Sequence, residues 1–379
     1  MKRKLKNAGT VIIQGNAAMV EGAIAGGCKY FAGYPITPAT EISEHASLRL
    51  PQEDAVFMQM EDELCSICSA IGAGLAGSRA MTATSGPGFC LMSEGISYAI
   101  AAERPVVIGY ISRGGPSGGQ VAMPTQGDIM QCRYNSNGDF QSITLCPSSV
   151  QEMFDFTRRA FDLADKYMMP VIVLSDALMG HLTEKIVIPE EVEIYDNTAQ
   201  EPVDEWYRPD ENDLIPHVNF YQGSNGRWES GTHNYRGVAN GASTQLGSQF
   251  VRHISGKVLK NIDNIVDVKT FFDDDMDVGV ICYGTTARSV GAAVENAREE
   301  GYRVGWMKVN TVWPLPEKQI MEFCSKAKHI LVPEMNMGQY VLEIQRLVGK
   351  EKISGLSSLG GQIFSPSMIE NAIAEVMGK

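Results

Sequence analysis

Short apolar runs alternate with longer segments of helical period from Val11 to about Ala177, and this alternation constrains the fold more than any other feature. The runs VIIQ, AVFMQM and RAMTATS are each followed by a segment with the apolar spacing of a helix. Such alternation is typical of βαβ units, in which helices cover both faces of a parallel sheet. We therefore predict an α/β fold with a parallel-sheet domain over residues 1–185.

The regular pattern stops after this domain and then returns. Residues 186–267 are rich in Asn, Gly, Trp and Tyr and hold no clean period, so we predict an irregular connecting segment. From Asp277 the runs VGVICYG, RVGWMKV and HILVPEM again alternate with segments of helical period. This return predicts a second, smaller α/β domain over residues 268–379.

Composition excludes several classes of partner. A formal net charge of -13 argues against nucleic acid, because binding to a phosphate backbone depends on clustered Lys and Arg. No apolar stretch approaches the roughly 20 residues of a membrane span, and the basic N-terminus is not followed by the apolar region of a signal peptide. The 8 cysteines are mostly single, which favours a reducing compartment. We expect a cytoplasmic protein that binds neither nucleic acid nor membrane.

Three stretches rich in Gly, Pro and hydroxyl groups follow apolar runs: Gly33–Thr40, Thr82–Gly88 and Ser112–Gly119. Ligands of open α/β folds bind at the carboxyl ends of sheet strands, where such turns lie. Two prolines stiffen the backbone around Thr37, and Arg113 has a planar fork that fits a carboxylate. A proline-rich turn and a surface arginine are the structural alternatives, and spacing alone does not exclude them.

Glu63 is the candidate acid. It is the last of three acidic residues that open a predicted helix, where negative charge also has a purely structural role. Glu63 shares a helix face with Ile67 and Ala70, so we expect its carboxyl among packed small residues. A carboxyl in such surroundings can hold a proton or share one with a ring nitrogen.

Two other features invite a functional reading. Cys65 and Cys68 form a CxxC pair, but the remaining cysteines do not supply the further ligands of a zinc or iron–sulfur site. We interpret both as buried packing residues and expect no metal on this chain. His233 lies in the turn-rich stretch GTHNYRG, and a structural role is the alternative favoured there.

Seven stretches occur in the chain in this order: GYPITPAT, QMEDE, TATSGPG, SRGGPS, LCPSSVQEM, GTHNYRG and VPEMNMGQ. Together they resemble the alpha subunits of 2-oxoacid:ferredoxin oxidoreductases, most of all the 2-oxoglutarate type, over nearly the whole chain. The resemblance implies a pyrimidine-binding module of a thiamine diphosphate enzyme, followed by a domain like the C-terminal domain of transketolases. It also implies CoA-dependent oxidative decarboxylation of 2-oxoglutarate to succinyl-CoA, or the reverse carboxylation, with ferredoxin as electron partner.

The resemblance assigns roles to particular residues. It implies that Glu63 hydrogen-bonds N1' of the cofactor's aminopyrimidine ring. It implies that Thr37 and Arg113 hold the 2-oxoacid. Further residues are implied to contact the cofactor: Pro35, Ile36, Ser85 and Gly86.

The chain lacks a Gly-Asp-Gly stretch followed by the Asn that completes a magnesium–pyrophosphate module, and it lacks iron–sulfur ligands. The resemblance therefore implies a beta subunit that carries Mg²⁺ and the iron–sulfur cluster. Two departures bear on the substrate: Gly118 stands where many 2-oxoglutarate relatives have Thr, and the following loop QVAMPTQGD differs in composition. The stretch Asn336–Gln339 favours 2-oxoglutarate over branched-chain acids. A branched-chain or aryl 2-oxoacid subunit and a non-catalytic scaffold stay open as alternatives.

Overall fold

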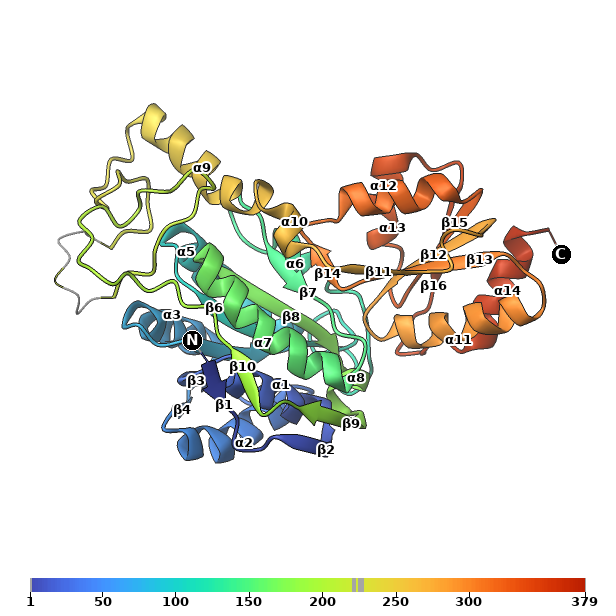
Figure 1. Cartoon of the computed structure of the whole chain (residues 1–379), viewed down its shortest axis with the longest axis horizontal. Helices are drawn as coiled ribbons and strands as arrows, with labels where there is room; N and C mark the ends of the chain where they lie inside the picture. Colours follow the sequence, from blue (N-terminus) through green and yellow to red (C-terminus); the bar gives the residue numbers. More distant parts are fainter. Residues whose placement is uncertain (1, 220–222, 224–227, 379) are drawn as a thin grey trace.

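The computed structural model describes residues 2–219, 223 and 228–378, and two sheets organise them into an N-terminal and a C-terminal α/β unit (Figure 1). The first sheet has seven strands in the order β14-β7-β8-β6-β5-β3-β4. Neighbouring strands of this sheet are parallel, except that β14 runs antiparallel to β7. The strands are β3 (Tyr30–Gly33), β4 (Val56–Gln59), β5 (Ala80–Thr84), β6 (Val106–Ser112), β7 (Ile143–Leu145), β8 (Pro170–Asp176) and β14 (Thr311–Trp313).

Helices cover both faces of this sheet because successive strand residues point to opposite sides. Val107 of β6 packs in one apolar cluster, whereas its neighbour Ile108 packs in the other. The first cluster includes residues of α1 (Gly15–Ala25), α2 (Thr40–Arg49) and α7 (Val150–Tyr167). The second includes residues of α3 (Glu63–Leu75), α4 (Gly86–Leu91) and α5 (Ser93–Ala101).

The C-terminal unit is a five-stranded sheet in the order β11-β13-β12-β15-β16. Only its edge strand β11 is antiparallel. The strands are β11 (Val268–Phe271), β12 (Val278–Tyr283), β13 (Val304–Val309), β15 (His329–Glu334) and β16 (Ile353–Ser357). The helices are α11 (Thr286–Glu299), α12 (Glu317–Lys326), α13 (Tyr340–Val348) and α14 (Pro366–Val376).

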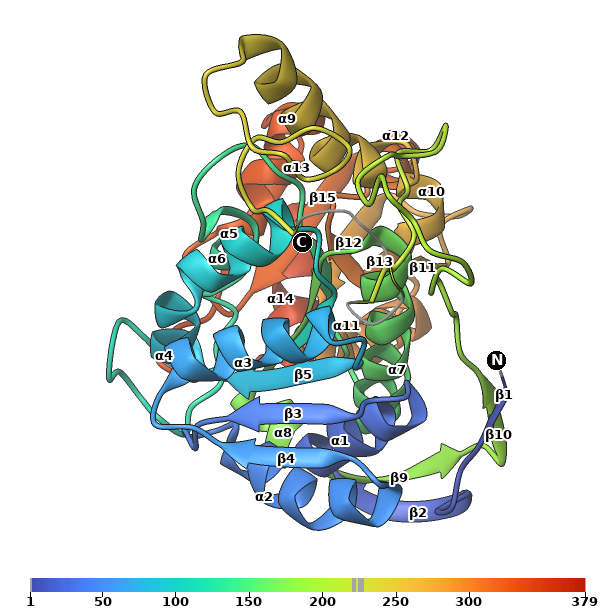
Figure 2. The same ribbon diagram turned by 90° about the vertical axis from the view of Figure 1, so that its left-hand side faces the viewer.

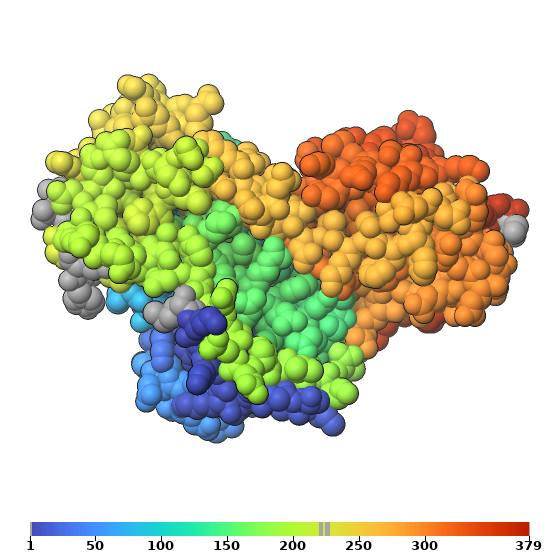
Figure 3. All heavy atoms as spheres, viewed as in Figure 1, coloured from blue at the N-terminus to red at the C-terminus, as the bar shows by residue number. Residues whose placement is uncertain are grey.

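Short elements complete the architecture. Two antiparallel pairs join β1 (Lys2–Lys4) to β10 (Glu191–Glu193) and β2 (Gly9–Gln14) to β9 (Thr183–Ile188). The remaining helices are η1 (Leu50–Glu53), α6 (Gln131–Tyr134), α8 (Ala177–His181), α9 (Thr244–Leu259) and α10 (Ile262–Ile265). The space-filling view shows two lobes, and the yellow-orange residues 244–265 face the orange-red lobe across a hollow (Figure 3).

The predicted α/β fold with a parallel, doubly covered sheet is confirmed. The prediction of irregular structure throughout residues 186–267 is wrong at its ends and over α9. Gly247 and Gly256 lower the helix propensity of α9, yet Ile254 and Val258 bury one face of it, and tertiary packing stabilises the helix. None of the helices that the structure describes has the length and hydropathy of a bilayer span.

A buried ion cluster fastens α9 to the end of α5. Glu103 lies just after α5, and its carboxylate accepts from Lys257 Nζ at 3.0 Å and lies 2.9 Å from His253 Nε2. Lys257 also donates to the Met168 carbonyl at 3.0 Å. Burial alone would raise the pKa of Glu103, but the charges of Lys257 and His253 outweigh it and lower the pKa to about 2.

Replacing Lys257 by Met is expected to lower the free energy of unfolding by about 3–5 kcal/mol, because Glu103 is left buried without its partner. The double variant Glu103→Gln/Lys257→Met is the matched control and should recover most of the loss. Because the Glu103 pKa is lowered, its stabilisation is complete above the ordinary value of 4.5 and disappears as the pH falls toward about 2. Urea unfolding across this pH range measures both effects. An unchanged free energy for Lys257→Met would contradict this account.

Candidate functional site

The predicted site segments lie together because β4, β3, β5 and β6 are consecutive in the sheet and run parallel. Their carboxyl ends therefore meet at one edge, and Figure 2 shows β5, β3 and β4 side by side near this edge. The segment after β4 begins α3, and the segment after β5 begins α4. The segments after β3 and β6 are loops. Residues far apart in the sequence are thus brought to one edge of the sheet.

Glu63 is the buried acid of this edge. It is the first residue of α3, and only 4% of it is exposed. Thr84 at the end of β5 donates from Oγ1 to Glu63 Oε1 at 3.4 Å. A Cβ at Gly88 would overlap both of these oxygens, so the glycine leaves the space that the carboxyl occupies. The expectation that Glu63 points inward among packed residues is confirmed.

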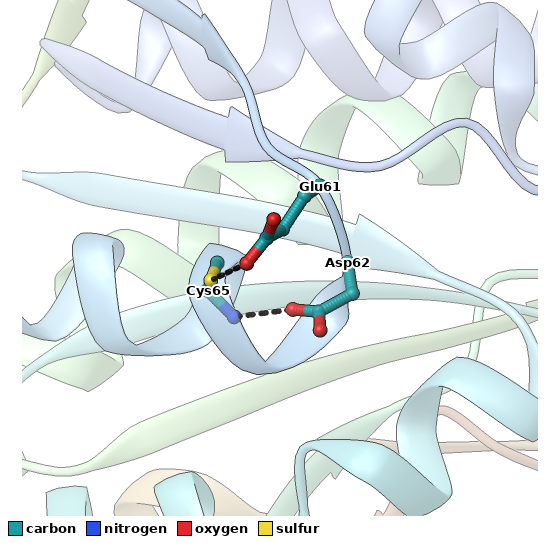
Figure 4. A group of neighbouring side chains, drawn as sticks. All are labelled: Glu61, Asp62 and Cys65. Atoms are coloured by element: carbon teal, nitrogen blue, oxygen red, sulfur yellow. Dashed lines mark hydrogen bonds between the residues drawn. The ribbon is translucent and has the colours of Figure 1, made fainter.

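The two neighbouring acids have different roles, which Figure 4 shows. Asp62 caps α3, and its Oδ1 accepts from the backbone N–H of Cys65 at 2.7 Å. Glu61 is exposed and accepts from Cys65 Sγ at 3.5 Å, and this hydrogen bond raises the pKa of Cys65 to about 11. The potential ligand atoms of Glu61, Asp62 and Cys65 lie within 4.8 Å of one another, and exposed acidic groups are common without a metal ion.

The prediction that both cysteines of the CxxC pair are buried is wrong. Cys65 is only half-buried, and Cys68 is exposed. Both lie in the first two turns of α3, where its buried face is already formed by Glu63, Ile67 and Ala70. Residues at positions 65 and 68 fall outside that face, because a helix turns once every 3.6 residues.

Arg113 and Thr37 are in contact across the edge of the sheet. Arg113 directly follows β6, and its Nη1 donates to the Thr37 carbonyl at 2.6 Å. The Arg113 side chain is largely buried, with 9% of the residue exposed, and its Nε has no hydrogen-bond partner within the described part of the chain. Asn16 of α1 holds the same loop by donating to the Pro38 carbonyl at 2.8 Å. The guanidinium is therefore fixed at one nitrogen and free to bind at another.

Ser85 and Gly86 form the turn between β5 and α4. Ser85 is fully buried, and its hydroxyl has no hydrogen-bond partner among the described residues. A Cβ at Gly86 would lie 3.6 Å from Asp128 Oδ2 and 3.7 Å from the Tyr110 hydroxyl. The backbone of this turn therefore lies at van der Waals distance from two polar side chains.

Pro35 and Ile36 lie in the loop after β3, next to Thr37. Pro35 and Thr37 are exposed, and Ile36 is half-buried against the apolar cluster of α1 and α2. This loop therefore forms the solvent-facing rim of the edge, whereas Glu63 and Ser85 lie in its interior.

Asp128 is a residue of this edge that the sequence analysis missed. It lies in the long loop after β6, and its Oδ2 is buried without a hydrogen-bond partner in the ranges that the structure describes. Burial raises the pKa of Asp128, although the hydroxyls of Tyr110 and Ser112 and the charge of Arg113 act in the opposite direction. The loop has no apolar periodicity. The sequence therefore marks Asp128 only as an acidic residue in the loop after β6.

His233 lies outside this edge, beneath α9. Its ring centroid is 3.9 Å from that of Tyr207 and 5.4 Å from that of Phe250, and its Nδ1 lies 2.9 Å from the Asn234 carbonyl. These contacts fit the structural role that we favoured. A cavity of about 730 Å³ lies beside it, lined by α9 and by Tyr207, Pro209, Asp213 and residues 233–235.

Comparisons with known proteins agree with this geometry. Residues 21–239 match the family model described as pyruvate flavodoxin/ferredoxin oxidoreductase, thiamine diphosphate-binding. Residues 276–369 match the model of pyruvate:ferredoxin oxidoreductase core domain II. The first match includes β3 to β6 and therefore every segment of the edge described above.

Curated relatives are similar over nearly the whole chain. The 2-oxoglutarate synthase subunit KorA of Methanothermobacter marburgensis is 46% identical over 95% of this chain and 97% of its own. KorA of Methanocaldococcus jannaschii is 43% identical over 95% and 98%. The ketoisovalerate oxidoreductase subunit VorB of Methanothermobacter thermautotrophicus is 34% identical over 97% and 98%. Identity is thus higher to the 2-oxoglutarate type than to the branched-chain type.

Solved structures give the same grouping. A 2-oxoglutarate:ferredoxin oxidoreductase from Magnetococcus marinus, solved with 2-oxoglutarate, coenzyme A and succinyl-CoA bound, superposes with a TM-score of 0.93 at 31% identity. That alignment covers 98% of this chain and 66% of the solved chain. A split-gene transketolase shares the fold alone, with a TM-score of 0.56 at 11% identity over 96% and 97%. The chain belongs to the pyruvate flavodoxin/ferredoxin oxidoreductase family, and within it to the relatives of the 2-oxoglutarate synthase subunit KorA.

Proposed function

We propose that this chain is the alpha subunit of a 2-oxoglutarate:ferredoxin oxidoreductase and supplies the pyrimidine-binding half of a thiamine diphosphate site. The complex would convert 2-oxoglutarate and coenzyme A to succinyl-CoA, or run the reverse carboxylation, with ferredoxin as electron partner. The observation that carries the proposal is the Glu63 carboxyl, buried beside Thr84 in the space that Gly88 leaves open. The higher identity to KorA than to VorB supports 2-oxoglutarate as substrate.

The residues at the edge fit an aminopyrimidine ring. The buried Ser85 hydroxyl and Asp128 Oδ2 have no hydrogen-bond partner in the described residues, and a Cβ at Gly86 would meet Asp128 Oδ2 and the Tyr110 hydroxyl at van der Waals distance. Buried polar atoms without partners are rare in folded proteins, so they support a polar ligand at this place. We assign the ring contacts to Glu63, Ser85 and Gly86, with Pro35 and Ile36 on the neighbouring loop. Thiamine diphosphate, when bound, supplies the electron sink for decarboxylation of the 2-oxoacid.

Glu63 would act on the cofactor through a proton. Its carboxyl can share one with the N1' nitrogen of the ring, and the low dielectric of the buried edge strengthens this hydrogen bond. The Thr84 hydroxyl orients the carboxyl by donating to Oε1. Asp62 fixes the start of α3 and so the backbone position of Glu63. Together, Thr84 and Asp62 would hold the Glu63 carboxyl in one orientation relative to the ring.

Arg113 and Thr37 would bind the 2-oxoacid. Nη1 of Arg113 is held by the Thr37 carbonyl, which leaves Nε and Nη2 for the C1 carboxylate. A largely buried guanidinium binds a carboxylate more strongly than an exposed one, because water competes less. The hydroxyl of Thr37 lies on the same exposed loop and could reach the keto group.

The exposed apolar side chains around this edge support a protein partner. Tyr34 and Met58 are exposed beside the loops after β3 and β4, and Leu64 and Leu91 are exposed on α3 and α4. Val121 and Met123 are exposed on the loop after β6. Exposed apolar side chains that gather around one site support a protein interface there. We assign it to a beta subunit that carries the Mg²⁺–pyrophosphate module and the iron–sulfur cluster, and we place the complex in the cytoplasm, where the free thiols of all 8 cysteines persist.

Activity of the reconstituted complex on a panel of 2-oxoacids tests the substrate. We expect kcat/KM for 2-oxoglutarate to exceed that for 2-oxoisovalerate by at least about tenfold, with ferredoxin as acceptor and coenzyme A present. A preference for 2-oxoisovalerate would favour the branched-chain alternative. No activity on any 2-oxoacid would favour the non-catalytic scaffold and overturn the proposal.

Replacing Glu63 by Gln is expected to lower turnover by two or more orders of magnitude, because the amide cannot exchange a proton with the ring nitrogen. Folding should be nearly unchanged, since Gln has the same shape and can still accept from Thr84. Gly115→Ala is the matched loop control, because a Cβ there meets no atom within 4 Å. Exchange of the C2 proton of thiamine diphosphate, followed by NMR in the complex, gives a direct readout. A wild-type exchange rate in Glu63→Gln would show that Glu63 does not have this role.

A further inference from the structure

The loop QVAMPTQGD, which ends at Asp128, contacts the stretch Asn336–Gln339 of the C-terminal unit. Both stretches stood out in the sequence, and the structure joins them through Gln126, of which only 6% is exposed. Gln126 Nε2 donates to the Tyr283 carbonyl at 2.8 Å. Its Oε1 accepts from Thr286 Oγ1 and from the backbone N–H of Met335, both at 2.9 Å.

The backbone of Gln126 is bound to the same unit. Its N–H donates to the Met335 carbonyl at 3.1 Å, and its carbonyl accepts from Asn336 Nδ2 at 2.9 Å. Every polar group of Gln126 therefore has a partner in the C-terminal unit. An interaction of this completeness fixes both the position and the orientation of one residue in a long loop.

Contacts to the C-terminal half of the chain continue on both sides of Asp128. Thr125 Oγ1 donates to the Met335 carbonyl at 3.2 Å, and Gln339 Nε2 donates to the Gly127 carbonyl at 2.8 Å. Trp313 Nε1 donates to the Ile129 carbonyl at 2.8 Å. Residues 125–129, which we call the docking segment, are thus held by groups between Tyr283 and Gln339.

Glu334 stiffens the groups that hold the docking segment. Its carboxylate is buried at the end of β15 and accepts from the Tyr283 hydroxyl and from Asn336 Nδ2, each at 2.9 Å. It also accepts from the backbone N–H groups of Tyr340 and Val341 at 2.9 Å, at the start of α13. These four donors fix the position of the Glu334 carboxylate between β15 and α13.

Asp128 differs from its neighbours in the docking segment, because its side chain faces the N-terminal unit. Its Oδ2 lies 3.6 Å from the position of a Cβ at Gly86 and makes no hydrogen bond of ordinary geometry among the described residues, although the Tyr110 and Ser112 hydroxyls face the same carboxyl. The loop around it has no regular structure between β6 and α6, so its own conformation would not hold a side chain in place. The contacts of the C-terminal unit supply that constraint.

We propose that Asp128 is a further residue of the active site that hydrogen-bonds the bound ligand, and that Gln126 is the positioning residue that holds Asp128 there from the C-terminal unit. The inference rests on the proposed function. The free oxygen Oδ2 accepts from an N–H group of the ligand at the Gly86 wall of the site. The C-terminal unit therefore contributes to the site through the docking segment.

A double-mutant cycle in the reconstituted complex tests the inference. Asp128→Ala and Gln126→Glu should each lower kcat/KM for the 2-oxoacid by at least about tenfold. Gln126→Glu keeps the shape of the side chain but turns an oxygen toward the Tyr283 carbonyl, so that hydrogen bond is lost. Because Gln126 acts through Asp128, the double variant should be within about twofold of Asp128→Ala alone. Full additivity of the two losses would overturn the positioning role.

Lys308→Met is the matched control. Lys308 also joins the two units, donating to Ser148 Oγ at 2.9 Å and to Glu152 Oε1 at 2.5 Å, and neither of these partners belongs to the docking segment. This variant should stay within about twofold of wild-type kcat/KM. Gln339→Met, which removes the donor to Gly127, is a milder second variant and should show an intermediate loss.

Amide hydrogen exchange of residues 123–131 in the complex without substrate provides a readout besides activity. Exchange should be faster in Gln126→Glu than in wild type and unchanged in Lys308→Met. Equal exchange in all three proteins would overturn the positioning role. If the wild-type complex is active and Asp128→Ala has the same kcat/KM, the proposed ligand contact of Asp128 is overturned. The proposed function is not affected by that result. A wild-type complex inactive on every 2-oxoacid would instead overturn the proposed function, and the exchange data would still test Gln126.

Discussion

The parallel pairing of β4, β3, β5 and β6 is the constraint on which the site depends. Because parallel strands all end on the same side, the segments after them converge at one edge. Glu63, Ser85 and Arg113 come from three different strand ends, and none of them needs a long loop to reach the others. The buried Glu63 carboxyl accepts a hydrogen bond from the Thr84 hydroxyl at Oε1, and we propose that its other oxygen serves the ligand.

Two further sets of atoms support the proposal that the edge is one half of a larger site. Buried polar atoms such as Ser85 Oγ, Arg113 Nε and Asp128 Oδ2 find no protein partner within the described chain, although burial of such atoms is costly. Apolar side chains such as Leu64 and Leu91 stay exposed beside them. A ligand can satisfy the first set, and a partner protein can cover the second. The family model that matches this part of the chain is described as thiamine diphosphate-binding.

Local pattern was enough to predict the sheet, its covering helices and the strand ends that carry Glu63, Thr37 and Arg113. Apolar periodicity indicates which face of an element is buried, and it therefore predicted that Glu63 is buried. The same reasoning failed where tertiary contacts decide. α9 contains two glycines but is stabilised by packing at Ile254 and Val258. Asp128 is placed by groups more than 150 positions away in the chain, through hydrogen bonds of Gln126 that leave no period in the sequence.

We propose that this chain supplies the ring-binding half of a shared thiamine diphosphate site. Calorimetric titration of thiamine diphosphate with Mg²⁺ into the purified chain, alone and with its partner subunit, tests it most directly. Glu63 and an apolar wall are too little to offset the entropy of immobilising a flexible dianion, so the chain alone should bind more weakly than roughly 100 µM. Addition of the partner should restore tight binding that Glu63→Gln leaves nearly unchanged. A micromolar dissociation constant for the chain alone would contradict the account.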